Sequence, residues 1–288
     1  METLVLSRIQ FALSAGIHFI MPVTTLGLAF YIAVAEGLFL KTGQDLYRNI
    51  SSLGVRILAF VFAVGVATGI ILPFAFGANW SDFVSFASSV FGIHLTIETV
   101  VAFMLESIFL GVLLFGRGRI GKVPYFLSAL MVLLGSHLSA FFIISANSWL
   151  QTPFHSLETL ASGIPRAEID GFHLIQLADG TSKVIMDDVL KVIFNPSTVV
   201  RFLHTITACW LCGAVVMAAV AASHLRKFPT AKTAKRALAI AVTIGVVTSI
   251  AQPLLGHQQI MAVVEWGRAK DAAMGGLFET RRDGPLYA

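Results

Sequence analysis

Six long apolar segments are the feature that most constrains how this chain can fold. An apolar run of about 20 residues is long enough to cross the hydrocarbon core of a bilayer as an α-helix. Segments of this kind lie at approximately 10–39, 54–76, 91–115, 124–147, 198–222 and 237–255. Only 12% of the 288 residues are charged, against about 25% in soluble domains. The sequence therefore predicts an all-α membrane protein with six transmembrane helices.

The basic residues of the connecting segments predict the orientation of these helices. Lysine and arginine are concentrated in the first, third and fifth connections, whereas residues 77–90 contain none and the long fourth connection, residues 148–197, contains three. Cytoplasmic connections carry an excess of Lys and Arg. We therefore expect the N-terminus, the fourth connection and the C-terminal tail to lie outside. The net charge of +4 follows this distribution and predicts no nucleic-acid partner.

Ionisable side chains inside the predicted helices are functional candidates, because they are costly in hydrocarbon. The candidates are His18 in the first helix, His94, Glu98 and Glu106 in the third, His137 in the fourth and His204 in the fifth. Neutral imidazole is a common axial ligand of haem iron. Two cysteines, Cys209 and Cys212, share one helix and are interpreted as packing residues.

His18, Glu98 and His204 are predicted to lie at one depth in the membrane. Their helices all run from outside to inside, and each residue is about seven or eight positions from the expected outer end. At about 1.5 Å per residue this is about 10–12 Å below the outer surface. The three side chains therefore predict a layer of cofactor sites. A structural reading stays open for each histidine, and His94 could simply pair with Glu98, four residues away.

Glu106 is expected about 22 Å from the outer end of its helix at about 1.5 Å per residue, well below this layer. A carboxyl group at such a depth most often serves a proton path. Glu98 is eight residues away, or about 12 Å along an α-helix, so hydroxyl groups or waters would have to bridge the gap.

Several stretches of the sequence resemble subunit I of the cytochrome bd-type oxygen reductases, especially the cyanide-insensitive branch. The matching stretches include IETVVAFMLESIFLGVLLFGRGRIGK, GSHLSAFFIISANSWLQTP and VIMDDVLKVIFNPSTVVRFLHT. They follow one another in the family's order and, with LSRIQFALSAGIHFIMPVTTLGLAF and AQPLLGHQQ, cover nearly the whole chain.

This resemblance implies haem cofactors, namely low-spin and high-spin haem b, with haem d as a further candidate. His18 matches the histidine ligand of a high-spin haem, and His204 matches the histidine ligand of the low-spin haem. His94 and His137 stand where the family more often has small or apolar residues, so each is either a substitute ligand or a packing residue. Trp149 is a further cofactor-binding candidate.

The resemblance also implies which residues act in catalysis. Glu98 and Glu106 match two acidic residues assigned to the haem pair and its proton supply, and Glu98 is also a candidate iron ligand. Ser107 and Ser139 fall where the family has hydroxyl groups on the same route.

Family members usually have nine helices, and the later ones supply a methionine and a glutamate as haem ligands. Residues 1–255 therefore form the expected transmembrane haem-binding domain, and residues 256–288 are expected to be a truncated remnant of the quinol-binding region. Lys270 matches a lysine of that region, but Gly275 stands in place of the expected quinol glutamate. We accordingly expect no direct quinol site in this tail. The missing ligands are expected from a second membrane subunit or a second copy of the chain.

The sequence thus predicts a haem-binding subunit of a bd-like terminal oxygen reductase, multi-pass in a bacterial or archaeal plasma (inner) membrane. Its electron donor would be quinol through a partner, a cytochrome c or an associated redox enzyme. Two alternatives stay open. One is an electron-conducting haem anchor that does not reduce oxygen, and the other is a transporter that couples ions to Glu98 and Glu106.

Overall fold

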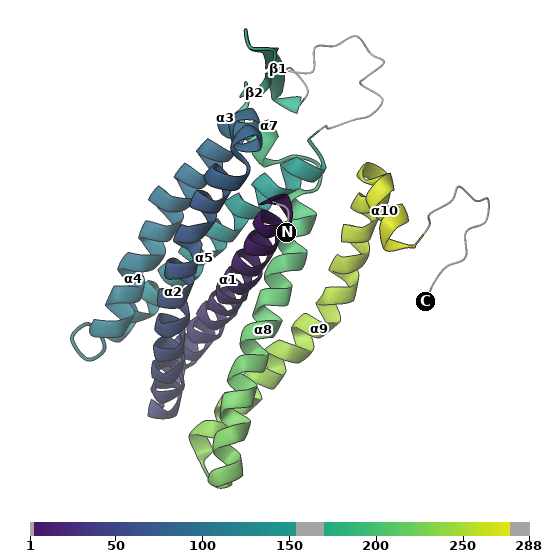
Figure 1. The fold of residues 1–288 in the computed structure, drawn as a ribbon. Coiled ribbons are helices and arrows are strands. Elements are labelled where there is room, and N and C mark those ends of the chain that lie inside the picture. The colour runs from purple at the N-terminus through teal and green to yellow at the C-terminus, as the bar shows by residue number, and fades with distance from the viewer. Residues whose placement is uncertain (1–2, 154–169, 277–288) are drawn as a thin grey trace.

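The computed structural model describes residues 3–153 and 170–276, which contain six helices long and apolar enough to cross a membrane (Figure 1). They are α1 (Thr3–Thr42), α2 (Asp45–Asn79), the continuous helix α3–η1–α4 (Ser81–Phe115), α5 (Lys122–Gln151), α8 (Thr198–Lys227) and α9 (Lys232–Trp266). The predicted all-helical membrane fold is confirmed. The helices extend beyond the apolar segments, by ten residues at Ser81, because hydropathy marks only the part inside the hydrocarbon while backbone hydrogen bonding continues past it.

The third transmembrane helix is not a regular α-helix. It consists of α3 (Ser81–Ile97), the π-helical segment η1 (Glu98–Phe103) and α4 (Met104–Phe115). A π-segment makes i→i+5 bonds and is frequently found at functional sites. The expected axial spacing of Glu98 and Glu106 therefore does not hold, because it assumed an unbroken α-helix.

The fourth connection is partly folded, although the sequence suggested only a long loop. Strands β1 (Phe172–Gln176) and β2 (Ser182–Met186) form an antiparallel hairpin in which Phe172 is opposite Met186. A short helix, α7 (Val189–Ile193), leads into α8. The hairpin rests on α3, because the Ser89 hydroxyl donates a 2.7 Å hydrogen bond to the carbonyl oxygen of Val184.

The tightest contact of the bundle is the crossing of α1 and α8. A Cβ atom on Gly213 would fall 2.5 Å from the Cα of Gly27, closer than non-bonded carbons approach. Small residues allow membrane helices to come this close and gain van der Waals contact. The main apolar cluster lies inward of this crossing and includes Leu28, Tyr31 and Met217.

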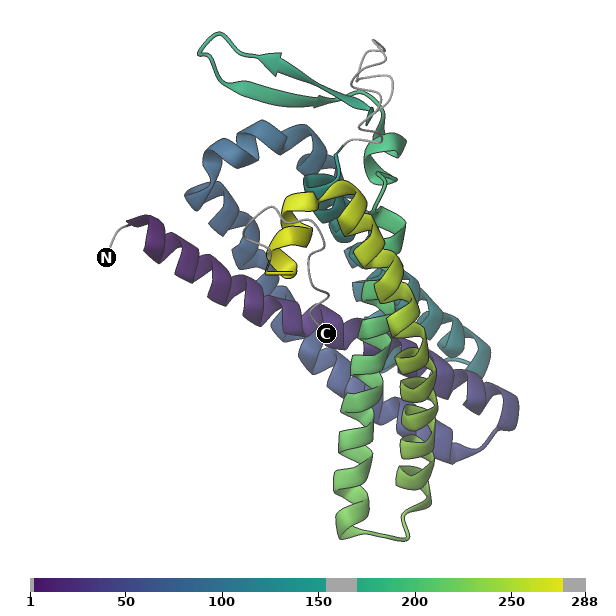
Figure 2. The same ribbon diagram turned by 90° about the vertical axis from the view of Figure 1, so that its right-hand side faces the viewer.

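The outer halves of α1 and α9 are packed less tightly than their inner halves. All fully buried residues of α1 lie between Thr25 and Phe39. Figure 2 shows the outer half of α1 leaning away from α8 and α9. In Figure 1, α9 bends away from α8 in its outer half, which contains Pro253, a residue that removes a helical hydrogen bond.

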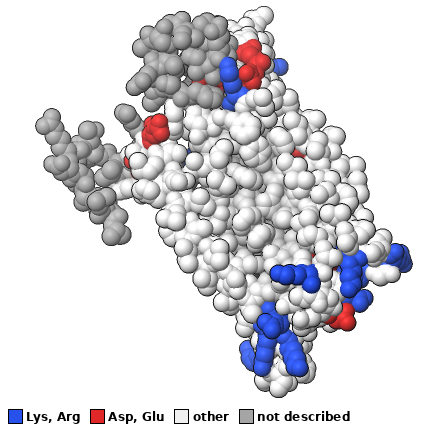
Figure 3. All heavy atoms as spheres, turned by 180° about the vertical axis from the view of Figure 1, so that it is seen from behind, with Lys and Arg blue, Asp and Glu red and all other residues white. Residues whose placement is uncertain are grey.

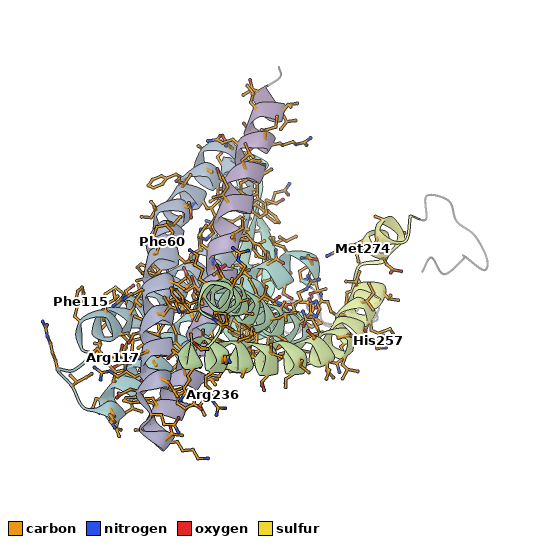
Figure 4. The ribbon with its side chains drawn as sticks, turned by 90° about the horizontal axis from the view of Figure 1, so that it is seen from below. Phe60, Phe115, Arg117, Arg236, His257 and Met274 are labelled. Atoms are coloured by element: carbon orange, nitrogen blue, oxygen red, sulfur yellow. The ribbon has the colours of Figure 1, made fainter. Side chains whose placement is uncertain are left out.

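A buried ion pair closes the inner end of the bundle. Arg117, in the turn after α4, contacts Glu36 of α1 and donates a 3.0 Å hydrogen bond to Ser51 of α2. Its guanidinium carbon lies 3.7 Å from the ring centroid of Tyr125 on α5. The pair therefore holds three helices together at this end, where Figure 4 labels Arg117.

The surface charges agree with the expected orientation. In Figure 3, lysine and arginine gather at the end formed by the turns between α1 and α2, α4 and α5, and α8 and α9. The sides of the bundle are uncharged and apolar, as with Phe60 and Phe115, which are 72% and 70% exposed and point outward in Figure 4. The chain is a multi-pass membrane protein with its basic end on the predicted inner side.

We expect Gly213→Ala to lower the free energy of unfolding by about 1–3 kcal/mol, because the added methyl group must push the two helices apart. The matched control is Gly111→Ala in α4, where an added Cβ would have no atom within 4 Å. That variant should be neutral or slightly stabilising, because alanine favours a helix over glycine. Thermal unfolding of the purified protein in detergent measures both, and equal melting temperatures would contradict the close crossing.

Candidate functional site

His18 lies on α1 with one ring nitrogen held and the other available. Its Nδ1 is 3.1 Å from Oγ1 of Thr68 on α2, and the Thr68 hydroxyl itself donates to the carbonyl oxygen of Val64 at 2.9 Å. The proton of the histidine–threonine bond must therefore come from Nδ1. In the neutral ring this leaves the Nε2 lone pair free for a metal, the arrangement in which a second partner orients a ligating histidine.

A glycine makes room for this imidazole. A Cβ atom on Gly69 of α2 would lie 2.9 Å from Cε1 of His18. Any larger residue at this position would displace the ring. The position of His18 therefore depends on Thr68 and Gly69, two consecutive residues of α2.

His204, on α8, is buried against α9. Gly256 of α9 faces its ring, since an added Cβ would lie 3.3 Å from Cε1 of His204. Nδ1 of His204 is buried and has no hydrogen-bond partner among the described residues. The side-chain oxygens of Gln252 and Gln259 on α9 also lack partners among those residues. Buried polar atoms are rarely left unpaired, so this region suits a bound group.

The two histidines lie at matching positions relative to the α1–α8 crossing. His18 precedes Gly27 by nine residues, and His204 precedes Gly213 by nine residues. At about 1.5 Å per residue, both are about 13–14 Å outward of the crossing. The depth of the two histidines is better compared by their distance from the crossing than by their distance from the helix ends. The observed helices begin at Thr3, Ser81 and Thr198 rather than at one common level.

Both ring nitrogens of His94 and of His137 have partners within the chain. His94 is fully buried, with Nδ1 2.7 Å from the Val90 carbonyl oxygen and Nε2 3.1 Å from Oγ of Ser145. His137 donates from Nδ1 to the Leu133 carbonyl oxygen at 2.7 Å, and its Nε2 accepts from Nε1 of Trp210 at 3.0 Å. Neither ring presents a free nitrogen here.

The two predicted carboxyl groups face the same side of α5. Oε1 of Glu98 accepts a 2.7 Å hydrogen bond from the Ser139 hydroxyl. Glu106 packs against Gly135, since a Cβ atom added to Gly135 would lie 3.0 Å from the Cβ atom of Glu106. Gly135 and Ser139 are four residues apart and so share one helix face.

Glu106 is 5% exposed, and its Oε1 has no hydrogen-bond partner among the described residues. A buried carboxylate without partners is costly, so the group is expected to be protonated or to meet a water. The Ser107 hydroxyl donates its proton to the Phe103 carbonyl oxygen at 2.6 Å, so it does not donate to either glutamate.

Trp149 lies at the outer end of α5 beneath the β-hairpin. Its ring is 5.5 Å from that of Phe172 in an edge-to-face arrangement, and its Nε1 has no partner among the described residues. The geometry joins it to the hairpin cluster rather than to either histidine.

Sequence reasoning missed a buried polar network that connects α5 to the start of α8. Oγ of Ser148 lies 2.7 Å from Oδ1 of Asn195 and 2.6 Å from Oγ of Ser197, and Thr152 joins the same Ser197 oxygen at 2.6 Å. These residues lie in ANSWLQTP and FNPST. The signal in the sequence that could have indicated this network is the group of polar residues at the end of an apolar helix. The network fixes the beginning of the helix that carries His204.

A cavity of about 340 Å³ with two cationic residues in its lining lies at the outer ends of α5, α8 and α9. Arg201, three residues before His204, lines it together with Gln151, Trp266 and Lys270. Lys270 belongs to α10 (Arg268–Met274) and donates a 2.6 Å hydrogen bond to Oε1 of Gln151. Burial, and then the nearby charge of Arg201, lower the pKa of Lys270.

Comparison with known proteins identifies the relatives of this arrangement. The family model for cytochrome bd terminal oxidase subunit I matches residues 6–288. The chain is 34% identical over 275 residues to the cytochrome bd-II ubiquinol oxidase subunit 1 of Escherichia coli, covering 96% of this chain and 50% of that protein. It is 35% identical over 283 residues to the cytochrome bd ubiquinol oxidase subunit 1 of Bacillus subtilis, covering 98% and 56%.

A solved structure agrees with these sequence matches. The bd oxidase from Geobacillus thermodenitrificans superposes with a TM-score of 0.84 at 27% identity, covering 96% of this chain and 59% of that chain. The chain therefore spans between 50% and 59% of the length of the relatives described here. With a match over nearly its whole length, this chain belongs to the cytochrome bd terminal oxidase subunit I family.

Proposed function

We propose that this chain is a haem-binding subunit of a membrane-bound terminal oxidase that reduces oxygen to water. One observation carries the proposal. Two histidines occupy matching positions on crossing helices, His18 with its Nε2 lone pair free and His204 with a buried, unpartnered ring nitrogen. Membership of the bd oxidase subunit I family supports the same function.

The residues present fit haem as the cofactor. Imidazole is a usual axial ligand, and the Nδ1 atom of His204 and the side-chain oxygen of Gln252 are buried without partners among the described residues. Arg201 and Lys270 supply positive charge close to His204, which suits the propionate carboxylates of haem. Bound haem would supply one-electron and oxygen chemistry that no amino-acid side chain provides. We assign His204 to the low-spin b haem and His18 to a high-spin haem.

We further propose that Glu106 and Glu98 move protons toward the His18 site from the inner side. Glu106 is buried without a partner, and Glu98 is held by Ser139. The face of α5 that carries Gly135 and Ser139 packs against Glu106 and binds the carboxyl group of Glu98, so it forms one wall of the route. The gap between the carboxyl groups would be bridged by water, because Ser107 donates to its own helix.

The proposed electron supply comes from a quinol through a partner. Two of the relatives are named ubiquinol oxidases, which supports quinol as the donor class. Lys270, which matches a lysine of the family's quinol-binding region, donates to Gln151 within this chain, in agreement with the expectation of no direct quinol site in the tail. We therefore infer that quinol delivers electrons through another subunit of a membrane complex in a bacterial or archaeal plasma membrane.

His204→Ala should abolish the low-spin haem signal, and His18→Ala should abolish carbon monoxide binding while the low-spin spectrum remains. Each change removes the nitrogen that coordinates iron. The readout is the reduced-minus-oxidised optical spectrum of the purified complex, with and without carbon monoxide, together with haem content. The matched control is His257→Ala, an exposed histidine on α9 that should leave both signals unchanged.

The spectrum of the wild-type complex also distinguishes an oxygen reductase from the two alternative functions. A wild-type complex with only low-spin haem would favour an electron-conducting anchor, and one without haem would favour an ion-coupled transporter. Survival of both signals in a correctly assembled His18→Ala complex would make His18 structural.

Glu106→Gln should slow oxygen reduction by more than about tenfold while the haem spectra stay unchanged, since glutamine keeps the shape but cannot release a proton. Oxygen consumption by the purified complex with a reduced quinol analogue measures the effect. Asp82→Asn, an exposed acid at the start of α3, is the control for loss of a carboxyl group. Full turnover in Glu106→Gln would refute the proton route.

A further inference from the structure

A second cavity lies at the opposite end of the bundle from the histidines. It has a volume of about 470 Å³ and is formed by the beginning of α2, the end of α8 and the beginning of α9. These three helix ends all lie on the basic, inner side of the molecule, at the lower end in Figure 3. The function proposed above does not use this cavity.

The inner part of the cavity is lined by apolar side chains. Its lining includes the buried side chains of Ile50 and Met217 and the partly exposed side chains of Leu53 and Val220. From Met217 to Lys227 the α8 wall is ten residues long, or about 15 Å at about 1.5 Å per residue. This length matches a glycerol backbone with the upper part of two acyl chains.

The mouth of the cavity is polar and positively charged. Lys227 and His224 lie on one face of the last turn of α8, with Asn49 of α2 and Thr233 of α9 opposite. No acidic residue lines the cavity, and no carboxylate among the described residues lies within ion-pair distance of Lys227. By contrast, the nearby Arg48 is paired with Asp45 at 3.6 Å.

We propose that this cavity binds one anionic phospholipid of the inner leaflet, with its phosphate at Lys227 and its acyl chains along the apolar wall. Basic pockets between transmembrane helices on the cytoplasmic side suit such head groups. The occupant must be amphiphilic, because a cationic mouth at the level of the membrane surface leads into an apolar groove. A transmembrane segment of another protein would leave the cation of Lys227 without a partner.

The test titrates the purified complex in detergent with dimyristoyl phosphatidylglycerol and, separately, with dimyristoyl phosphatidylcholine. Native mass spectrometry counts the bound lipids, in parallel with binding measured at about 0.3 M salt, where the Debye length is below about 8 Å and diffuse attraction is weak. The wild-type complex should bind one phosphatidylglycerol at this site about tenfold more tightly than phosphatidylcholine, because the choline cation of phosphatidylcholine offsets the attraction between its phosphate and Lys227.

Lys227→Gln should remove this preference, and Lys227→Arg should keep it. The matched control is Lys235→Gln on α9, which removes the same charge from the same end of the molecule but does not line the cavity. Both positions are exposed, so gel filtration should report an unchanged complex for all three variants.

Three results would overturn the proposal. The first is a wild-type complex without preference for phosphatidylglycerol, as expected if a polypeptide fills the cavity. The second is an equal effect of Lys227→Gln and Lys235→Gln, which would indicate diffuse attraction to the basic end. The third is glycerol phosphate binding as tightly as the lipid, which would make the site one for a soluble anion.

Discussion

The close crossing of α1 and α8 at Gly27 and Gly213 is the contact on which the rest of the molecule depends. Inside a bilayer the hydrophobic effect does not drive helices together, so backbone contact through small residues has to do so. Inward of the crossing the helices form a dense apolar core. Outward of it they diverge, and both candidate haem ligands lie on the diverging segments. A cofactor as large as haem requires this separation.

The outer end of the bundle is organised by polar contacts rather than by apolar packing. The network of Ser148, Asn195 and Ser197 satisfies buried hydrogen-bonding groups where α5 ends and α8 begins. The β-hairpin then covers α3 and Trp149. Because these contacts hold the start of α8, they determine where His204 stands. A rigid support of this kind keeps a ligand from following the motions of a long connection.

The carboxyl groups illustrate how one helix can serve two sites. The π-helical segment that begins at Glu98 changes which residues of the third helix face α5. Ser139 then meets Glu98, while Gly135, one turn away, admits Glu106.

The sequence by itself determined the membrane class, the six helices and the inner location of the basic residues, because hydropathy and charge act locally along the chain. It also identified His18, His204, Glu98 and Glu106 as candidates, since ionisable side chains are conspicuous in apolar segments. Only the tertiary structure decided the tautomer of His18, the partners of His94 and His137, the π-helical segment and the glycine crossing. Those features depend on contacts between residues far apart in the chain, and local patterns carry no information about such contacts.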